Sequence, residues 1–367
     1  MRKILFVLLL LTHFQSFGQT PLKPGFENEE YSNILSIFVA RSDDPKFKGD
    51  VPNPQDFEFN YESPTVGLLN KWYLWTHTEE KLAIISFRGT VPDPVSWLAN
   101  FYSAMIPAKG ELKISEDNTF AYNLSDDPKA AVHVGWTLSL GALAPTLENK
   151  MDSLVNVGYQ DFIITGHSQG GAIAYLATAH LHSLKKSGRW DKDIRLKTYA
   201  SAAPKPGNLF FAYHYEEMTS DGWAFNVVNA EDWVPEVPFS VQTVNDFSEL
   251  NPFSDISGFL KGQKFAQRIV FKSIYNKLDN PTQKSTKNFS KFFGKKLGKQ
   301  IQKQLPGHEI PEFYPSNHYV RTGNYIVLRA DEEYLEKYLH NPEEIFLHHM
   351  IVPYYELFQK RIKNNPE

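Results

Sequence analysis

The sequence predicts an α/β fold in which a mostly parallel central sheet carries helices on both faces. Two short apolar runs rich in strand-forming residues, 82–87 and 161–165, are each followed by a glycine-containing turn. Apolar residues with helical spacing lie between these runs and again after the second one. Strands that alternate with helices favour parallel pairing, and such sheets collect their chemistry at the carboxyl ends of the strands.

The rest of the chain continues this alternation. A short helical pattern covers residues 31–38, within a segment rich in proline, asparagine and acidic residues. Further along the chain we expect helices over 147–155 and 170–184, strands over 196–200, 225–228 and 325–328, and a final helix over 345–361.

The N-terminal segment has the pattern of a secretory signal. Arg2 and Lys3 precede an apolar run over residues 4–11, and a small-residue ending follows at 16–18. The run is much shorter than the ~20 residues that span a bilayer. We therefore expect a signal peptide over 1–18, one large domain over 19–367, and a location that is secreted or in the bacterial periplasm or envelope.

Composition excludes several classes of function. The chain has 367 residues and no cysteine, which excludes disulfides, thiol catalysis and cysteine metal sites. A net charge of -4 gives no general attraction to nucleic acid, so we expect no nucleic-acid partner. The charge is uneven, however, because residues 261–303 hold eleven lysines and one arginine against a single acid, Asp279. Residues 239–316 differ in composition from the rest and are interpreted as an inserted basic helical segment.

A nucleophile motif stands at the end of the second apolar strand. Residues 166–171 read Gly-His-Ser-Gln-Gly-Gly and fit the pattern G-x-S-x-G between a strand and a helix. The glycines lack the Cβ atoms that would collide in so sharp a turn. Ser168 is thus the predicted nucleophile. The backbone N–H of Gln169, at the helix start, is a predicted donor to an oxyanion.

A serine nucleophile needs a base, and the base needs an orienting acid. In sheets of this type the order along the chain is serine, acid, histidine. Asp232 follows a predicted strand and is the preferred acid. Glu231 is its neighbouring competitor, and Asp221 precedes the strand at the wrong end.

The base has to be a late histidine. His348 and His349 head the final predicted helix and are preferred to the other late histidines, His308, His318 and His340. Of the adjacent pair we choose His348, with His349 as the alternative.

Several motifs in this order resemble those of the class 3 lipases, the fungal-type family with the α/β-hydrolase fold. The matching segments are 86–90 (Ser-Phe-Arg-Gly-Thr), 96–100, 132–136, the nucleophile motif, 198–208 and 228–235. The resemblance implies that Thr90 is the second oxyanion donor and that the acid lies at Asp232. The family's histidine precedes a Met…Tyr…Leu helix. His348, Met350 and Leu357 fit this spacing, whereas Tyr354 fits better when counted from His349.

The resemblance implies a hydrolase of lipid carboxylic esters that works through an acyl-enzyme. We expect no cofactor and no metal-ligand residues, and the sequence does not decide whether calcium is needed. A phospholipase A1 or an acyltransferase would use the same residues, and a non-catalytic lipid-binding envelope protein is the alternative from another class. The expected partner is a lipid or ester substrate, and the sequence does not specify an oligomeric state.

Two segments are candidates for contact with lipid. Over 91–105, Trp97, Phe101 and Met105 recur at four-residue spacing and form either a lid or a packed helix face, and His167 is a further expected substrate contact. The lysine-rich segment 261–304 has amphipathic patterns typical of helices that bind membrane surfaces. The alternative is a helix packed on the domain with its lysines in solvent.

Overall fold

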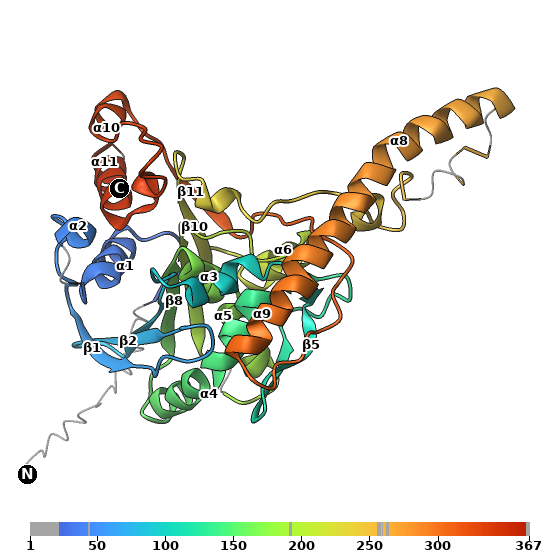
Figure 1. The fold of residues 1–367 in the computed structure, drawn as a ribbon. Coiled ribbons are helices and arrows are strands. Elements are labelled where there is room, and N and C mark those ends of the chain that lie inside the picture. Colours follow the sequence, from blue (N-terminus) through green and yellow to red (C-terminus); the bar gives the residue numbers. More distant parts are fainter. Residues whose placement is uncertain are drawn as a thin grey trace, which may run out of the picture.

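The central sheet has seven strands in the order β1-β2-β3-β8-β9-β10-β11 (Figure 1). The computed structural model describes residues 22–42, 45–190, 193–254, 258, 260–261 and 264–364. The predicted signal segment 1–18 lies outside the described residues. The strands are β1 (Phe57–Glu62), β2 (Trp72–His77), β3 (Leu82–Phe87), β8 (Asp161–His167), β9 (Arg195–Ser201), β10 (Ala224–Asn229) and β11 (Asn324–Leu328).

Pairing is parallel from β3 to β11 and antiparallel only at the β1-β2-β3 edge. The predicted α/β class with a mostly parallel sheet is therefore confirmed. The register brings Phe87 beside Gly166 and His167 beside Ser201, so β3, β8 and β9 end at the same edge. Because loops leave the sheet at these ends, side chains distant in sequence meet there.

Helices cover both faces of the sheet. On one face, α4 (Val134–Asn156) and α5 (Gln169–Lys186) pack their apolar residues into a core that includes Leu147 and Leu176. On the other face, α1 (Asn28–Val39) and α11 (Ile351–Asn364) form a second core around Tyr31 and Tyr354. The N-terminal and C-terminal helices therefore lie together against the same side of the sheet.

Some elements differ from the sequence expectations. The small sheets β4 (Met105–Pro107) with β7 (Ala131–His133) and β5 (Lys109–Ser115) with β6 (Asn118–Asn123) were not predicted. The final helix starts at Ile351 rather than at residue 345, and a short 3-10 turn, η4 (Leu347–His349), precedes it. The remaining helices are α2 (Pro45–Lys48), α3 (Pro94–Phe101), α6 (Leu209–Met218) and α10 (Glu332–Lys337), with the 3-10 turns η1 (Val234–Glu236) and η2 (Val244–Asp246).

The basic segment forms one long helical rod. It consists of α8 (Phe265–Phe289), the π-helical η3 (Ser290–Lys296) and α9 (Leu297–Gln304). In Figure 1 the α9 end lies on the body, while the first half of α8 projects away from it. No helix among the described residues is both long and apolar enough to cross a membrane.

Candidate functional site

Ser168 occupies a strained turn between β8 and α5. Its backbone has φ 61° and ψ -128°, a conformation that side-chain-bearing residues seldom adopt and that costs roughly 1–3 kcal/mol. Its N–H donates to the Ser201 carbonyl at 2.9 Å, which fixes the turn to the neighbouring strand. Gln169 is the first residue of α5, so its N–H has no acceptor within the helix and is available to an anion.

The glycines of this turn have no room for a side chain. A Cβ on Gly166 would lie 2.2 Å from the Gly170 carbonyl carbon, and one on Gly170 would lie 2.1 Å from the Phe87 oxygen. A Cβ on Gly89 would lie 3.7 Å from the Ser168 Cβ. The loop after β3, which carries Thr90, is therefore packed directly against the nucleophile turn.

Asp232 follows β10 and is almost completely buried. Its Oδ2 accepts hydrogen bonds from His349 Nδ1 at 2.7 Å and from the Tyr354 hydroxyl at 2.8 Å, and its Oδ1 accepts from the Val234 N–H at 2.9 Å. Burial alone would raise the pKa of Asp232, but the hydrogen bond and charge of His349, with the other donors, hold this pKa below its ordinary value. The carboxylate thus stays ionised and orients the His349 ring.

Of the two adjacent histidines, His349 contacts the acid, and the preference for His348 does not agree with the structure. The ring of His348 turns away to the hydroxyl of Tyr334, 2.9 Å from its Nδ1. The main chain explains the difference, because residues 347–349 form a 3-10 turn in which consecutive side chains point in different directions. Asn229, the last residue of β10, holds this turn by donating to the His348 carbonyl at 2.9 Å.

His349 is placed beside the nucleophile turn. Its ring centroid lies 4.8 Å from that of His167, the residue before Ser168. Because Nδ1 is engaged by Asp232, Nε2 is the ring nitrogen left to take a proton. Among the described residues, no hydrogen bond joins Ser168 Oγ to His349. In enzymes without substrate such contacts are often long and tighten only when substrate is bound.

His167, an expected substrate contact, has a position in which its ring supports the candidate base. Its Nε2 lies 2.7 Å from the His349 carbonyl oxygen and its Nδ1 lies 3.0 Å from Ser201 Oγ, so both ring nitrogens are engaged. Ser201 Oγ is in turn 2.8 Å from the Tyr31 hydroxyl of α1. Desolvation and the nearby His349 ring lower the pKa of His167 to about 3, so the ring is neutral at pH 7. It therefore donates from Nε2 and holds the main chain of the candidate base.

Thr90 and Gln169 are linked by Asn100, the next-to-last residue of α3. The Asn100 side chain donates from Nδ2 to Thr90 Oγ1 at 2.9 Å. Its Oδ1 accepts from Gln169 Nε2 at 2.9 Å and from the indole N–H of Trp136 at 3.0 Å. Since Thr90 Oγ1 accepts this bond, the hydrogen of its own hydroxyl remains available to an oxyanion.

We expect Asn100→Ala to lower kcat by about 10-fold to 100-fold, because Thr90 Oγ1 loses its fixed donor and the side-chain amide of Gln169 loses the nearer of its two acceptors, the other being the Ser96 carbonyl. The expected change is in kcat with little change in KM, since the affected groups act on the charge of the transition state. Asn149→Ala, on the outer part of α4, is the matched control. Equal changes in KM and kcat would argue against this positioning role.

His133 is completely buried, at 0% exposure, and its ring contacts the main chain of Asn100. Its Nδ1 accepts from the Trp136 N–H at 3.3 Å, and its Nε2 lies 3.1 Å from the Asn100 carbonyl oxygen, to which it donates. The ring stacks on Trp136 with centroids 3.6 Å apart. Desolvation lowers the pKa of His133 to about 3, and the neutral ring satisfies both contacts.

This arrangement predicts a pH-dependent stability. Below about pH 6.5 the unfolded chain protonates this histidine while the folded protein does not, so the unfolding free energy decreases as the pH falls from about 6.5 to about 3. The contribution of one histidine is at most about 1.4 kcal/mol per pH unit. Denaturant unfolding at several pH values should give a slope that is shallower for His133→Gln than for the wild type. Identical slopes would show that the His133 pKa is not lowered by folding.

Aromatic side chains cover the candidate base. The Trp97 and Phe101 rings of α3 are stacked with centroids 5.9 Å apart, and Trp97 also lies 5.8 Å from Phe346. Phe346 lies 5.9 Å from His349 and 5.3 Å from Trp233. Phe101 is 50% exposed, so this cover has an apolar outer surface. Met105 does not belong to it, because the chain leaves the helix at Phe101 and Met105 is buried in β4.

Three residues with contacts in the site were not predicted to take part in it: Asn100, Asn229 and Tyr354. Asn100 and Asn229 lie within the family-like segments, and Tyr354 has the spacing of the family pattern when it is counted from His349. A signal was therefore present for all three. Their roles depend on contacts with residues far away along the chain, and sequence spacing does not predict such contacts.

Comparison with known proteins agrees with the motifs. Residues 84–242 match the model of the family described as lipase (class 3). The chain is 27% identical over 164 residues to phospholipase A1-Ialpha2, chloroplastic, of Arabidopsis thaliana, a match that covers 42% of this chain and 32% of the relative. It is 26% identical over 169 residues to secreted mono- and diacylglycerol lipase 1 of Fusarium solani, which covers 45% of this chain and 42% of the relative. The matches span less than half the length of these relatives.

Solved structures of fungal lipases are also similar. The lipase of Rhizopus microsporus var. chinensis has 21% identity and a TM-score of 0.40, covering 59% of this chain and 71% of that one. The Lip2 lipase of Yarrowia lipolytica has 18% identity and a TM-score of 0.41, covering 60% of this chain and 79% of that one.

The family model spans β3 to β10 and includes the nucleophile turn, the Thr90 loop and Asp232. The resemblance drawn from the motifs is thus confirmed over this part of the chain, where residues 84–242 are similar to the class 3 lipase family.

Proposed function

We propose that the protein is a secreted serine hydrolase that cleaves lipid carboxylic esters, with Ser168, Asp232 and His349 as its triad. The observation that carries this proposal is the 2.7 Å contact between His349 and the buried Asp232, with the His349 ring beside the strained Ser168 turn. Nucleophile, base and orienting acid are the groups that acyl transfer requires. The class 3 lipase match over residues 84–242 supports the same chemistry.

In the proposed reaction, His349 Nε2 takes the Ser168 proton while Oγ bonds to the ester carbonyl carbon. The carbonyl π electrons move to the oxygen, and the resulting anion is bound by the N–H of Gln169 and by the N–H and hydroxyl of Thr90. One donor of this kind lowers the barrier by about 2.7–4 kcal/mol. The intermediate then collapses, the alcohol leaves with the proton from His349, and water hydrolyses the acyl-enzyme by the same steps.

The aromatic cover supports an apolar acyl group as substrate. The Phe346 ring lies 5.9 Å from the His349 ring, and Trp97, which stacks on Phe101, lies 5.8 Å from Phe346, so apolar rings adjoin the candidate base. An acyl chain is bound there by removal of apolar surface from water. Two relatives are named as a mono- and diacylglycerol lipase and a phospholipase A1, and we propose acylglycerols and phospholipids as the candidate substrates. The signal-like N-terminus and the word "secreted" in one relative's name support export.

Labelling with a fluorophosphonate tests the proposed function. Wild-type protein should be labelled at Ser168, and Ser168→Ala protein should not. A folded wild-type protein that takes up no label would instead be a lipid-binding protein without catalysis. A panel of triacylglycerols, diacylglycerols, phospholipids and p-nitrophenyl esters then separates a lipase from a phospholipase A1, and an added alcohol acceptor reveals acyl transfer.

A further inference from the structure

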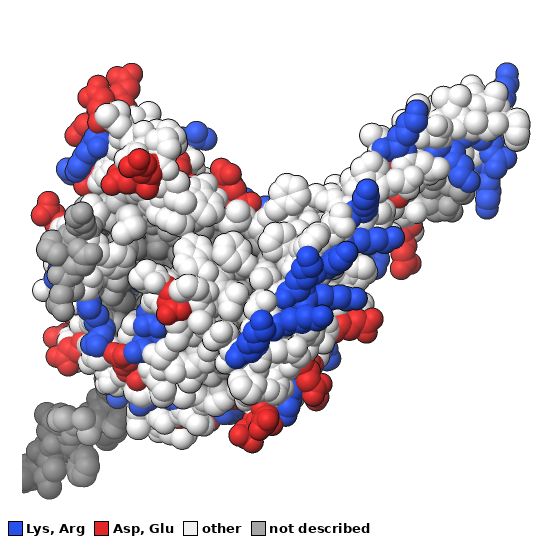
Figure 2. Space-filling view, in the orientation of Figure 1, with Lys and Arg blue, Asp and Glu red and all other residues white. Residues whose placement is uncertain are grey.

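The rod of α8, η3 and α9 presents a continuous row of positive charge. We name as the lysine stripe its seven exposed lysines, Lys284, Lys287, Lys291, Lys295, Lys296, Lys299 and Lys303. The sequence has no aspartate or glutamate between Asp279 and Glu309. Figure 2 shows the stripe as an unbroken blue band along the rod. Of the ion pairs among the described residues, none includes a lysine of the stripe.

The packed side of the rod fixes the direction of the stripe. Phe289 and Ile301 are 7% and 0% exposed, and the Thr286 hydroxyl donates to Asn317 Oδ1 at 2.8 Å. A Cβ on Gly294 would lie 2.6 Å from the Phe313 ring, so the rod rests closely on the body at this point. This half of the rod agrees with the packed alternative that the sequence left open. Its lysines are nevertheless held outward as one array.

The first half of α8 behaves differently, because its apolar side chains are not covered by the described body. Val270, Phe271, Ile274 and Leu278 lie on one side of the helix and are 56%, 49%, 50% and 70% exposed. At 100° per residue, Lys277 borders this apolar row and Lys272 lies on the opposite side of the helix. A helix with an apolar side and a lysine-bearing side is typical of helices that lie in the surface of a bilayer.

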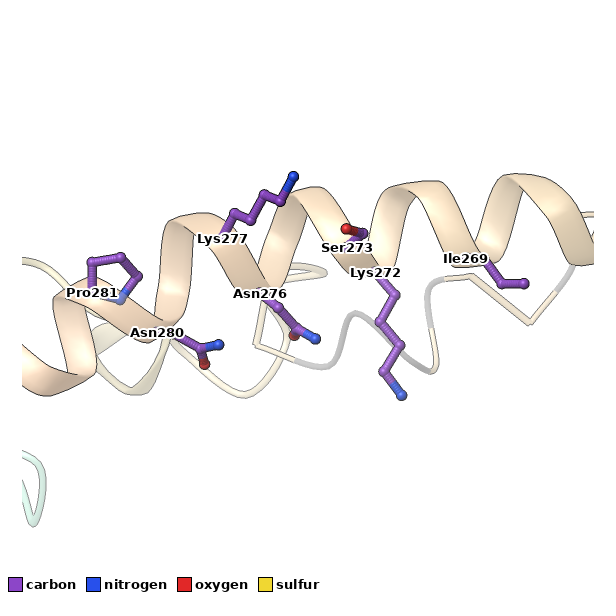
Figure 3. Close-up of a pocket in the computed structure, with 7 residues that line it drawn as sticks. All are labelled: Ile269, Lys272, Ser273, Asn276, Lys277, Asn280 and Pro281. Carbon is purple, nitrogen blue, oxygen red and sulfur yellow. The ribbon is translucent and has the colours of Figure 1, made fainter.

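A small-molecule site does not explain this helix. An open hollow of about 640 Å³ is lined by one length of α8, from Ile269 to Pro281. Figure 3 shows that its side chains point to both sides of the helix and toward no common centre, with Lys277 and Lys272 in opposite directions. An extended surface partner fits these directions better than a ligand held in a pocket.

The rod and the aromatic cover lie on the same face of the molecule. In Figure 1, α3 lies at the front beside α9, and Figure 2 shows the lysine stripe on that same front face. The backbone N–H of Ala104, just after α3, also lies 3.4 Å from the Phe293 carbonyl oxygen of the rod. A flat partner that contacts the stripe therefore also reaches the exposed Phe101.

We propose that this face docks on an anionic lipid bilayer, with the lysine stripe on the head groups and the apolar row of α8 in the interfacial layer. The proposal rests on the proposed function, because docking brings the α3 cover to substrate that is held in the bilayer. Charge selects an anionic surface, and the apolar row selects lipid over nucleic acid, which offers no apolar layer. Each lysine near such a surface strengthens binding about fivefold.

Binding is measured by co-sedimentation of the full chain with vesicles of phosphatidylcholine, alone or mixed with phosphatidylglycerol. All proteins carry Ser168→Ala, so hydrolysis does not alter the vesicles. The stripe variant is Lys287→Glu, Lys295→Glu and Lys299→Glu. The control, Lys81→Glu, Lys109→Glu and Lys363→Glu, makes the same change in net charge at exposed lysines elsewhere.

We expect the stripe variant to bind the mixed vesicles about 100-fold more weakly or worse, and the control to lose less than about fivefold. A second variant, Phe271→Ser, Ile274→Ser and Leu278→Ser, should also bind weakly although it keeps every lysine. Raised salt should weaken the wild type. Equal losses in stripe and control variants, equal binding to both kinds of vesicle, or tighter binding to duplex DNA would overturn the proposal.

The outcome is separable from that of the proposed function. Hydrolysis of a soluble short-chain ester by stripe variants that retain Ser168 should remain at the wild-type rate. If wild-type protein takes up no fluorophosphonate but binds anionic vesicles through the stripe, the docking stands without the enzyme. If esterase activity depends on Ser168 but the stripe variant binds vesicles as tightly as the wild type, only the docking is refuted.

Discussion

Replacing Ser168 by alanine is expected to lower kcat/KM for a soluble p-nitrophenyl ester by about 10⁵-fold to 10⁶-fold, the size of loss found when a serine nucleophile is removed. Without Oγ no acyl-enzyme forms, and only slow attack by water remains. Alanine has the same Cβ as serine, so the backbone at φ 61° is equally strained in both proteins. The fold should therefore be unchanged. Initial rates and circular dichroism of the purified variant check both expectations.

Ser187→Ala is the matched control, because Ser187 lies exposed at the other end of the same helix, α5. It should have wild-type activity. If the Ser168→Ala protein keeps more than a few per cent of the activity and a contaminating esterase is excluded, Ser168 is not the nucleophile. A loss of activity accompanied by loss of the folded spectrum would point to a structural role instead.

Alanine variants of the adjacent histidines, His348 and His349, should differ in kcat/KM by about four orders of magnitude. His349→Ala removes the ring that contacts Asp232 at 2.7 Å and should lower kcat/KM by about 10⁵-fold. His348→Ala removes only a contact with the Tyr334 hydroxyl and should cost less than about tenfold. The carbonyl of residue 348, which Asn229 holds, is retained in both variants.

The two variants are controls for each other, since they alter neighbouring residues of one turn. Fluorophosphonate labelling adds a second measurement, because Ser168 in the His349→Ala protein should react slowly for lack of a base. The reverse order, with His348 essential and His349 dispensable, would assign the base to the other ring. Equal large losses would indicate that the turn itself had been disturbed.

Local sequence was sufficient to predict those structural features that depend only on residues close together along the chain. Strand β3 has the predicted bounds, 82–87, because a six-residue apolar run before a glycine turn has few other conformations. The nucleophile turn follows in the same way from its glycines, which the contact distances show have no space for a Cβ. The antiparallel strands β1 and β2 were missed because their partners, rather than their own pattern, define them.

The supporting contacts of the site could not be predicted, because they join residues that are far apart along the chain. The contacts of Asp232 with His349 and of His167 with the His349 carbonyl span 117 and 182 residues. Which ring of the 348–349 pair faces Asp232 depends on a 3-10 turn that no residue preference indicated. The basic segment illustrates the same limit. Phe292 and Phe293 have the helical spacing of the buried Phe289 and Ile301 but are 45% and 39% exposed, since the helix becomes π-helical there.

The relay from Tyr31 through Ser201 and His167 to the His349 carbonyl ties the beginning of the chain to its end. During synthesis, the strained serine is therefore complete long before the imidazole that would activate it has been made. A fragment that ends before residue 349 carries a nucleophile without a base. Loss of α1 by proteolysis would loosen the same imidazole from the opposite direction. The proposed hydrolysis then requires both α1 and the 347–349 turn, so cleavage that removes either of them would inactivate the protein without changing Ser168.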